Sequence, residues 1–251
     1  MAGTIAVVRP RLVAIRQHIR GVKQRLLLVC IAFGLGSGLA WYFRSAIIGW
    51  LLLPAHGQLS QSGRPIFISP TEMLSLVISL TMRAGIVVAF PVAVYHIYRL
   101  LRPLLNKQQR RFVVIFLPAG FVCYLLGAAF AYFVLLPTGI NFLMQFGTDV
   151  ADPTIRITEY MGLVLAMLFW LGIVFELPLA MFLLAKLRVV SYQRIKKFRR
   201  YVPLAALFFG AIITPTADIV NSMLVTVPII LLFEFGAFLA WLARAKKERK
   251  A

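Results

Sequence analysis

Four ionisable side chains lie within or between long apolar runs, where a charge is energetically costly. Glu176 and Glu234 each occupy such a run, Arg83 interrupts another, and Asp218 separates the last two. Ionisable residues in segments of membrane length mark functional sites by default. A buried carboxyl group is readily protonated, so a proton relay is one interpretation, which the lack of a ladder of acidic residues weakens. The alternative is that Glu176 and Glu234 pair with other buried groups and hold a helix bundle together.

Residue types used in catalysis or metal binding form no recognisable pattern. The three histidines, His18, His56 and His96, share no helix face, and the sequence has no H-E-x-x-H, G-x-S-x-G or phosphate-binding-loop motif. Cys30 and Cys123 lie in apolar runs without the spacing of metal ligands. We therefore expect no catalytic residue, no metal and no cofactor, and the chain is predicted not to be an enzyme.

The composition indicates that most of the chain faces lipid. Of 251 residues, 61% are hydrophobic and 14% are charged, whereas soluble chains have roughly 45–50% and about 25%. This excludes a disordered protein, a secreted disulfide scaffold and most soluble enzymes. A transmembrane helix needs about 20 mostly apolar residues. We predict an all-α integral membrane protein with six transmembrane helices, at about 26–43, 73–98, 112–136, 160–185, 201–217 and 219–243.

Local signals refine these spans. Pro137-Thr138-Gly139 predicts a turn after the third span, and Pro178 predicts a kink in the fourth. Gly34 and Gly38 form a G-x-x-x-G face that should let a neighbouring helix approach closely. The apolar segment 47–71 is predicted to pack as a short interfacial element. The last two spans are short, so the bilayer should thin there or partners should lie beside them.

The charges predict the orientation in the membrane. The chain has 27 Lys and Arg against 8 Asp and Glu, a net charge of +19, and most basic residues cluster at both termini and in alternate loops. Under the positive-inside rule, these clusters place both termini in the cytoplasm. Residues 1–25 are then a basic cytoplasmic segment, residues 26–243 the membrane domain and residues 244–251 a basic cytoplasmic tail. We predict a multi-pass protein of the cytoplasmic (inner) membrane, embedded in the lipid bilayer, with no nucleic acid partner.

The order of several motifs carries a family resemblance. From His18 to the sixth span, the chain resembles TatC, the multi-span receptor subunit of the twin-arginine protein translocase. The segment from His18 to Leu27 is similar to the family box H-L-x-E-L-R-x-R-L. Further similarity lies in Pro54, Pro70-Thr71-Glu72, Phe90-Pro91, Arg102-Pro103-Leu104, Phe175-Glu176-Leu177-Pro178, Thr214-Pro215, Asp218, Pro228 and Phe233-Glu234.

The resemblance implies a six-helix TatC-like bundle and a function. The family transports folded proteins with the proton-motive force, binds signal peptides that carry an Arg-Arg pair, and works with small single-span TatA- and TatB-type subunits. Other TatC copies are a further candidate partner. The resemblance also assigns Pro54 a structural role in the external loop. It places the intramembrane polar and partner-helix positions at Glu176, Thr214, Asp218, Ser222 and Glu234.

The positions that resemble the signal-peptide site are substituted. Gly21 and Gln109 replace glutamates, Lys23 replaces an arginine, and Leu100 replaces a phenylalanine. Ser222 replaces a glutamine in the sixth span. Carboxylates bind arginine through bidentate, charge-assisted hydrogen bonds, so the loss of two carboxylates bears directly on recognition of an Arg-Arg pair.

Three interpretations remain open. The first is a divergent translocase receptor. The second is a paralogue that keeps the scaffold and partner binding but has lost signal recognition. The third is a secondary solute transporter, for which inverted repeats would be expected, and the two halves show no convincing repeat.

Overall fold

The computed structural model describes residues 3–55, 65–101, 107–145, 156–187, 189–213 and 219–243, which fold almost entirely into helices. The all-α architecture predicted from the sequence is confirmed for these residues. The elements are α1 (Gly3–Tyr42), α2 (Arg44–Leu52), η1 (Leu53–Ala55), α3 (Pro70–Leu101), α4 (Lys107–Phe130), the π-helix η3 (Ala131–Leu135), α5 (Leu136–Gln145), α6 (Ile157–Val174), α7 (Leu177–Lys186), α8 (Tyr192–Phe198), η4 (Arg199–Tyr201), α9 (Val202–Ile213) and α10 (Ile219–Leu242).

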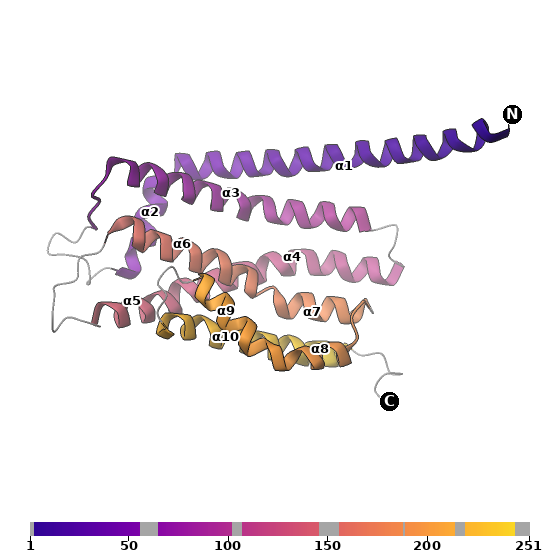
Figure 1. Cartoon of the computed structure of the whole chain (residues 1–251). Coiled ribbons are helices and arrows are strands. Elements are labelled where there is room, and N and C mark those ends of the chain that lie inside the picture. The colour runs from indigo at the N-terminus through magenta and orange to yellow at the C-terminus, as the bar shows by residue number, and fades with distance from the viewer. Residues whose placement is uncertain are drawn as a thin grey trace.

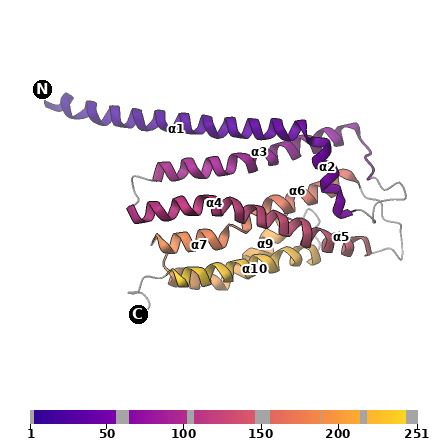
Figure 2. The same cartoon turned by 180° about the vertical axis from the view of Figure 1, so that it is seen from behind.

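The long helices lie side by side, with α1 and α3 at one edge and α9 and α10 at the other (Figure 1). Seen from behind, α1, α3, α4, α7 and α10 follow one another in the same order (Figure 2). We call the end of the bundle that carries α2 and α5 the outer end, and the end that carries α8 the inner end. Large apolar side chains such as Leu35, Leu204 and Phe208 are exposed on the outside, as expected of a surface that faces lipid.

Among the described residues, five segments are long and apolar enough to cross a membrane: Lys23–Tyr42, Pro70–Arg99, Arg110–Leu143, Ile157–Lys186 and Ser222–Leu242. The described part of the predicted fifth span lies in η4 and α9. The 12 residues of α9 extend only about 18 Å at 1.5 Å per residue. This helix packs along α10, so the short last pair of spans predicted from the sequence forms a helical hairpin.

The buried core is centred on α6. Met161 and Val164 are fully inaccessible, Leu171 is nearly so, and they belong to one cluster with buried residues of α3, η3, α9 and α10. In α7, by contrast, the buried residue is Pro178. The outer half of the bundle, which contains α6, is therefore packed more tightly than the inner half.

The predicted kink at Pro178 is confirmed. Helix α6 ends at Val174, and α7 begins at Leu177 with the proline in its first turn. Proline has no N–H to donate, so it cannot continue the hydrogen-bond ladder, but it is well tolerated at a helix start. The fourth span therefore consists of two shorter helices that meet at Phe175 and Glu176.

The predicted turn at Pro137-Thr138-Gly139 is wrong, because the helix continues through it to Gln145. The π-helix η3 lies immediately before the proline, and its wider turn closes with a Leu136 N–H to Ala131 C=O bond. The Thr138 hydroxyl donates to the Val134 carbonyl at 2.7 Å. The π turn shifts the hydrogen-bond register just before the residue that has no N–H to donate, and the helix continues past it.

The close helix approach expected at Gly34 and Gly38 occurs instead at Gly36. An ideal Cβ at Gly34 or Gly38 would meet nothing within 4 Å, whereas one at Gly36 would lie 3.2 Å from the Cα of Gly85 in α3. Because residues four apart share a helix face, Gly34 and Gly38 do lie together, but on the face turned away from α3. Gly36 and Gly85 set the crossing of α1 and α3.

Candidate functional site

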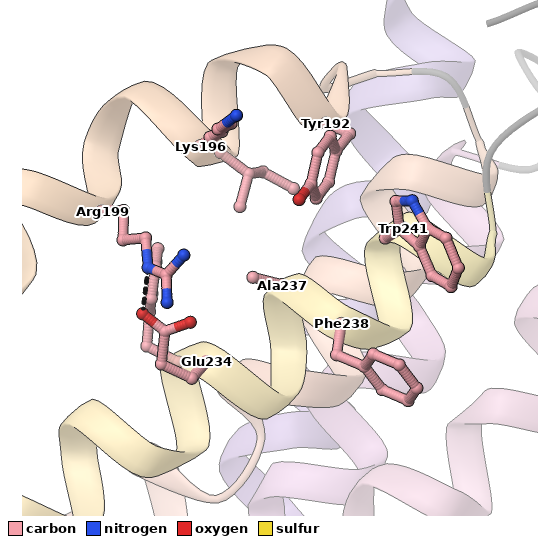
Figure 3. Close-up of a pocket in the computed structure, with 9 residues that line it drawn as sticks. Tyr192, Lys196, Arg199, Glu234, Ala237, Phe238 and Trp241 are labelled. Atoms are coloured by element: carbon pink, nitrogen blue, oxygen red, sulfur yellow. Dashed lines mark hydrogen bonds and ion pairs between the residues drawn. The ribbon is translucent and has the colours of Figure 1, made fainter. Parts of the chain in front are cut away.

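An ion pair joins Glu234 of α10 to Arg199 of η4 beside a pocket between α8 and α10 (Figure 3). The Arg199 Nε donates to Glu234 Oε1 at 2.6 Å. Both side chains remain partly exposed, Arg199 at 62% and Glu234 at 36%. Within the chain, Glu234 is thus engaged with a basic partner, and a partner helix would have to compete with Arg199 for it.

The pocket itself has a volume of about 340 Å³. In Figure 3, Tyr192 extends from α8 toward the turns of α10 that carry Ala237 and Trp241, and Lys196 lies one turn further along α8. Aromatic and basic side chains gather in this way at membrane–water interfaces. The lining residues are Tyr192, Ile195, Lys196, Arg199, Phe233, Glu234, Ala237, Phe238 and Trp241.

Glu176 lies at the break between α6 and α7. It occupies the N-cap position of α7 without making a capping hydrogen bond, and its Oε1 atom is buried without a hydrogen-bond partner. Helix α10 approaches this break closely, since a Cβ on Gly236 would lie 2.9 Å from the Cα of Pro178. A buried acceptor is costly unless a donor reaches it, and none of the described residues supplies a donor to this oxygen.

Ser222 is buried in the contact between α9 and α10. Its carbonyl accepts a hydrogen bond from the Thr226 hydroxyl at 2.7 Å. A Cβ on Gly210 would meet the same carbonyl at 2.7 Å, so the two helices touch through their backbones. Thr214 and Asp218, the other polar positions expected here, lie outside the described residues.

The four substituted signal-peptide positions lie in the middle of α1 and at the inner ends of α3 and α4. Gly21 and Lys23 belong to α1, Leu100 to the last turn of α3 and Gln109 to the first turn of α4. The Lys23 side chain is exposed. Figure 1 shows that the end of α3 and the start of α4 lie at the same end of the bundle as the N-terminal half of α1.

Pro54 lies in η1, next to a segment that is fixed to the bundle. The Tyr132 hydroxyl donates to the Trp50 carbonyl at 2.7 Å, and the Tyr160 hydroxyl donates to the Leu51 carbonyl at 2.9 Å. Leu51 is buried. The part of segment 47–71 around Trp50 and Leu51 is therefore fixed to the bundle, while its location in the membrane interface stays a prediction.

An ion pair between Glu72 and Arg156 was missed by the sequence reasoning. Arg156 Nη2 donates to Glu72 Oε1 at 2.5 Å, and the Ile157 N–H donates to the Ile66 carbonyl at 2.9 Å beside it. Hydrogen bonding to Glu72 raises the pKa of the Arg156 guanidinium above its ordinary value. The available signal was that each residue begins a span and the two charges are opposite.

No set of three His, Cys, Asp or Glu side chains in the described parts of the chain is arranged to hold a metal ion. What the described positions offer is one unsatisfied carboxyl oxygen at a helix break, one ion pair beside an interfacial pocket, and a tight helical hairpin. These features suit contacts with peptides and membrane helices.

Comparisons with known proteins agree on one family. The family model described as Sec-independent protein translocase protein (TatC) matches residues 17–228. The TatC protein of Aquifex aeolicus (strain VF5) is 33% identical over 92% of this chain and 96% of its own length. The TatC protein of Carboxydothermus hydrogenoformans is 29% identical over 93% and 96%.

A solved structure is similar over nearly the whole chain. The crystal structure of the twin-arginine translocase receptor TatC matches with a TM-score of 0.78 and 33% identity, covering 90% of this chain and 99% of that chain. The predicted six-helix TatC fold is thereby confirmed. Since both the family model and the full-length relatives extend from α1 into α10, this chain belongs to the TatC family of Sec-independent protein translocase proteins.

Proposed function

We propose that this chain is the receptor and core subunit of a twin-arginine translocation system, which moves folded proteins across a membrane with the proton-motive force. One observation carries the proposal: the chain matches a solved twin-arginine translocase receptor over 90% of its length with a TM-score of 0.78. Identity of 33% over that length supports a shared role as well as a shared fold.

The protein is proposed to lie in the cytoplasmic (inner) membrane. In the proposed orientation, the inner end of the bundle faces the cytoplasm. Figure 1 shows the N-terminal half of α1 and the last turns of α10 at that end. The basic residues of α8 and η4, such as Lys197 and Arg200, lie there as well. This arrangement fits the positive-inside rule with both termini in the cytoplasm.

We propose that single-span TatA- and TatB-type subunits contact the membrane face around Glu176. Support comes from Glu176, whose side chain is only partly buried and whose Oε1 atom has no donor among the described residues. Further support comes from the short α9 helix, beside which a partner could complete the bilayer-spanning surface. Ser222 is buried between α9 and α10. In this proposal it therefore holds these two helices together and does not contact the partner subunit. Thr214 and Asp218 are proposed to belong to the same polar region.

Signal peptides are the second proposed ligand, at Gly21, Lys23, Leu100 and Gln109. Gly21 and Gln109 supply no carboxylate for an Arg-Arg pair, and this favours a second candidate function, a TatC-like paralogue that has lost signal recognition. The receptor function then requires signal contacts from other residues or from a companion TatC copy. The secondary solute transporter interpretation receives no support from the relatives described above.

Export of a folded reporter tests the proposal. Cells that lack their own TatC should export a folded fluorescent protein with an Arg-Arg signal once this chain and single-span partners are supplied, and a Lys-Lys signal should stop export. A receptor should also bind the Arg-Arg peptide more tightly than the Lys-Lys peptide when purified.

The outcomes separate the two candidates. Stable insertion and partner co-purification without export or peptide preference would favour the paralogue. In that case, restoring both carboxylates with Gly21→Glu and Gln109→Glu should recover peptide preference. A chain that neither exports the reporter nor retains a single-span partner would refute both candidates.

A further inference from the structure

A polar stripe runs along one face of α3 from the outer end to the middle of the helix. Glu72, Ser75, Ser79 and Arg83 follow one another at intervals of three or four residues, and such intervals place side chains on the same helix face. A pocket of about 100 Å³ lies beside the last three of them. The stripe therefore leads from the outer surface to a cation within the second span.

The opposite wall of this pocket belongs to α6. Thr158 contributes a hydroxyl at the outer rim, and Gly162 faces the pocket without a side chain. An ideal Cβ at Gly162 would meet nothing within 4 Å. We call this cavity the Arg83 pocket. The cavity occupies the space that a side chain at position 162 of α6 would fill.

Arg83 has no anion beside it in the described part of the chain. Its Nη1 atom is buried without a hydrogen-bond partner. The acid of the same stripe, Glu72, is already bound by Arg156 Nη2 at 2.5 Å and by the Thr158 hydroxyl at 3.2 Å. Glu72 also lies eleven positions away, about 16 Å at 1.5 Å per residue. An unpaired guanidinium within a span is costly and normally has a partner.

The depth of Arg83 restricts what can pair with it. Arg83 lies 13 residues after Pro70, about 20 Å from the outer end of α3 at 1.5 Å per residue. Its side chain leans toward the N-terminal end of the helix, so the guanidinium lies near the middle of a hydrocarbon layer roughly 30 Å thick. Lipid phosphates lie at the edges of that layer, so they do not reach the pocket.

We propose that the Arg83 pocket receives a carboxylate side chain from a transmembrane helix of another protein, near the middle of that helix. The opposite charge, the Ser79 hydroxyl and the small volume of the pocket suit a carboxylate group. The hydroxyls of Ser75 and Thr158 already donate to the backbone carbonyl and the carboxylate of Glu72. The bonds formed would be charge-assisted, the stronger class of hydrogen bonds. This proposal goes beyond signal binding and does not depend on twin-arginine transport.

Neither Glu176 nor Glu234, the two acids that lie well inside the described spans, is suited to supply the carboxylate from a second copy of this chain. Glu176 lies 19 residues after Ile157, about 28 Å from the outer end of α6 at 1.5 Å per residue. It is therefore deeper than Arg83 by about 9 Å, a distance that follows from the same helical rise. Glu234 is already paired with Arg199. The acid is thus expected on a different protein.

A model helix of known sequence tests the proposal. The probe is a synthetic Leu-Ala transmembrane peptide with one central Glu, compared with a Gln peptide and with a peptide whose Glu lies near one end. Binding to the purified full-length protein is measured by energy transfer in phosphatidylcholine vesicles at pH 8. The central-Glu peptide should bind about threefold to tenfold more tightly than the other two, as expected for one polar contact between membrane helices.

Variants assign the preference to the pocket. Arg83→Gln should abolish it, Arg83→Lys should retain part of it, and Gly162→Leu should abolish it by filling the pocket while leaving the cation in place. Arg44→Gln is the matched control, because Arg44 is the first residue of α2, just after the outer end of α1, and donates to the Trp41 carbonyl. Its removal should leave the preference unchanged.

Three results would overturn the proposal. Equal binding of the central-Glu and Gln peptides would indicate that the pocket holds only water. A preference that survives both Arg83→Gln and Gly162→Leu would place the contact elsewhere. Loss of the preference when phosphatidylglycerol is added would identify a lipid anion as the occupant. If Arg83→Gln does not fold, Gly162→Leu and Arg83→Lys still decide between these results.

Discussion

Replacing Gly36 with alanine should push α1 away from α3, whereas the same replacement at Gly34 should not. A Cβ at position 36 would lie 2.7 Å from the Cβ of Val88 and 3.2 Å from the Cα of Gly85. Neither atom belongs to the flexible end of a side chain, so the helices themselves must separate. At position 34, the new methyl group would meet nothing within 4 Å.

The expected magnitude follows from two opposing effects. Each replacement gains about 1 kcal/mol of helix propensity, and Gly36→Ala also incurs about 1–3 kcal/mol from overpacking. Because the propensity gain is common to both variants, it cancels when they are compared. The free energy of unfolding of Gly36→Ala should therefore be lower than that of Gly34→Ala by about 1–3 kcal/mol.

Unfolding in mixed detergent and dodecyl sulfate micelles, followed by circular dichroism, measures this difference. Gly38→Ala serves as a second control, since its Cβ would also meet nothing within 4 Å. Pulsed electron paramagnetic resonance between labels on α1 and α3 should show a longer distance in Gly36→Ala alone. Equal stability and equal distances in the three variants would refute the assignment of Gly36 to the crossing.

Three further predictions concern the other contacts. Glu176→Ala should reduce co-purification of a single-span Tat partner, whereas Glu176→Gln should retain it because an amide oxygen can accept the same hydrogen bond. Gly210→Leu should open the α9–α10 hairpin at a cost of about 1–3 kcal/mol, measured as faster labelling of a cysteine introduced on α9, because its Cβ meets the Ser222 carbonyl. Tyr160→Phe should lower the free energy of unfolding by roughly 1–2 kcal/mol and speed hydrogen exchange in α2, since the Leu51 carbonyl loses its donor.

Each of these predictions has a control and a contradicting result. Unchanged co-purification with Glu176→Ala would make Glu176 a contact within the bundle only. Gly49→Leu should leave labelling of α9 unchanged, because a Cβ at Gly49 meets nothing within 4 Å, and equal effects at positions 49 and 210 would contradict the tight hairpin. Unaltered exchange in α2 after Tyr160→Phe would show that the remaining contacts of α2 suffice.

Features that depend on residues near one another in the chain were predictable. Runs without charge located the long spans, and Pro178 located the break in the fourth, since a missing N–H acts on the turn that contains it. The same logic failed at Pro137, because a π turn just before it shifts the hydrogen-bond register and lets the helix continue. The presence of a proline alone does not predict whether the neighbouring turns can rearrange their hydrogen bonds so that the helix continues.

Features that depend on how helices rotate against one another were not predictable. Periodicity grouped Gly34 with Gly38 correctly, but it could not tell which face of α1 meets α3. The ion pair between Glu72 and Arg156 joins residues 84 positions apart, and the charges alone did not select this partner. The sequence predicted a helix break at Glu176 because Pro178 follows it closely. That one oxygen of Glu176 lacks a hydrogen-bond donor could be recognised only from the packing of α7 and α10.

The uneven core gives the bundle a gradient of stiffness along the membrane normal. The outer half, fixed by α6, by the tyrosine bonds to α2 and by the Glu72–Arg156 pair, resists deformation. Below the break at Phe175 and Glu176, α7 packs along α10, whose other turns are anchored in the core through Val225 and Ile229. We therefore expect α7 to move about the break more easily than α6, while α10 and the outer half stay in place.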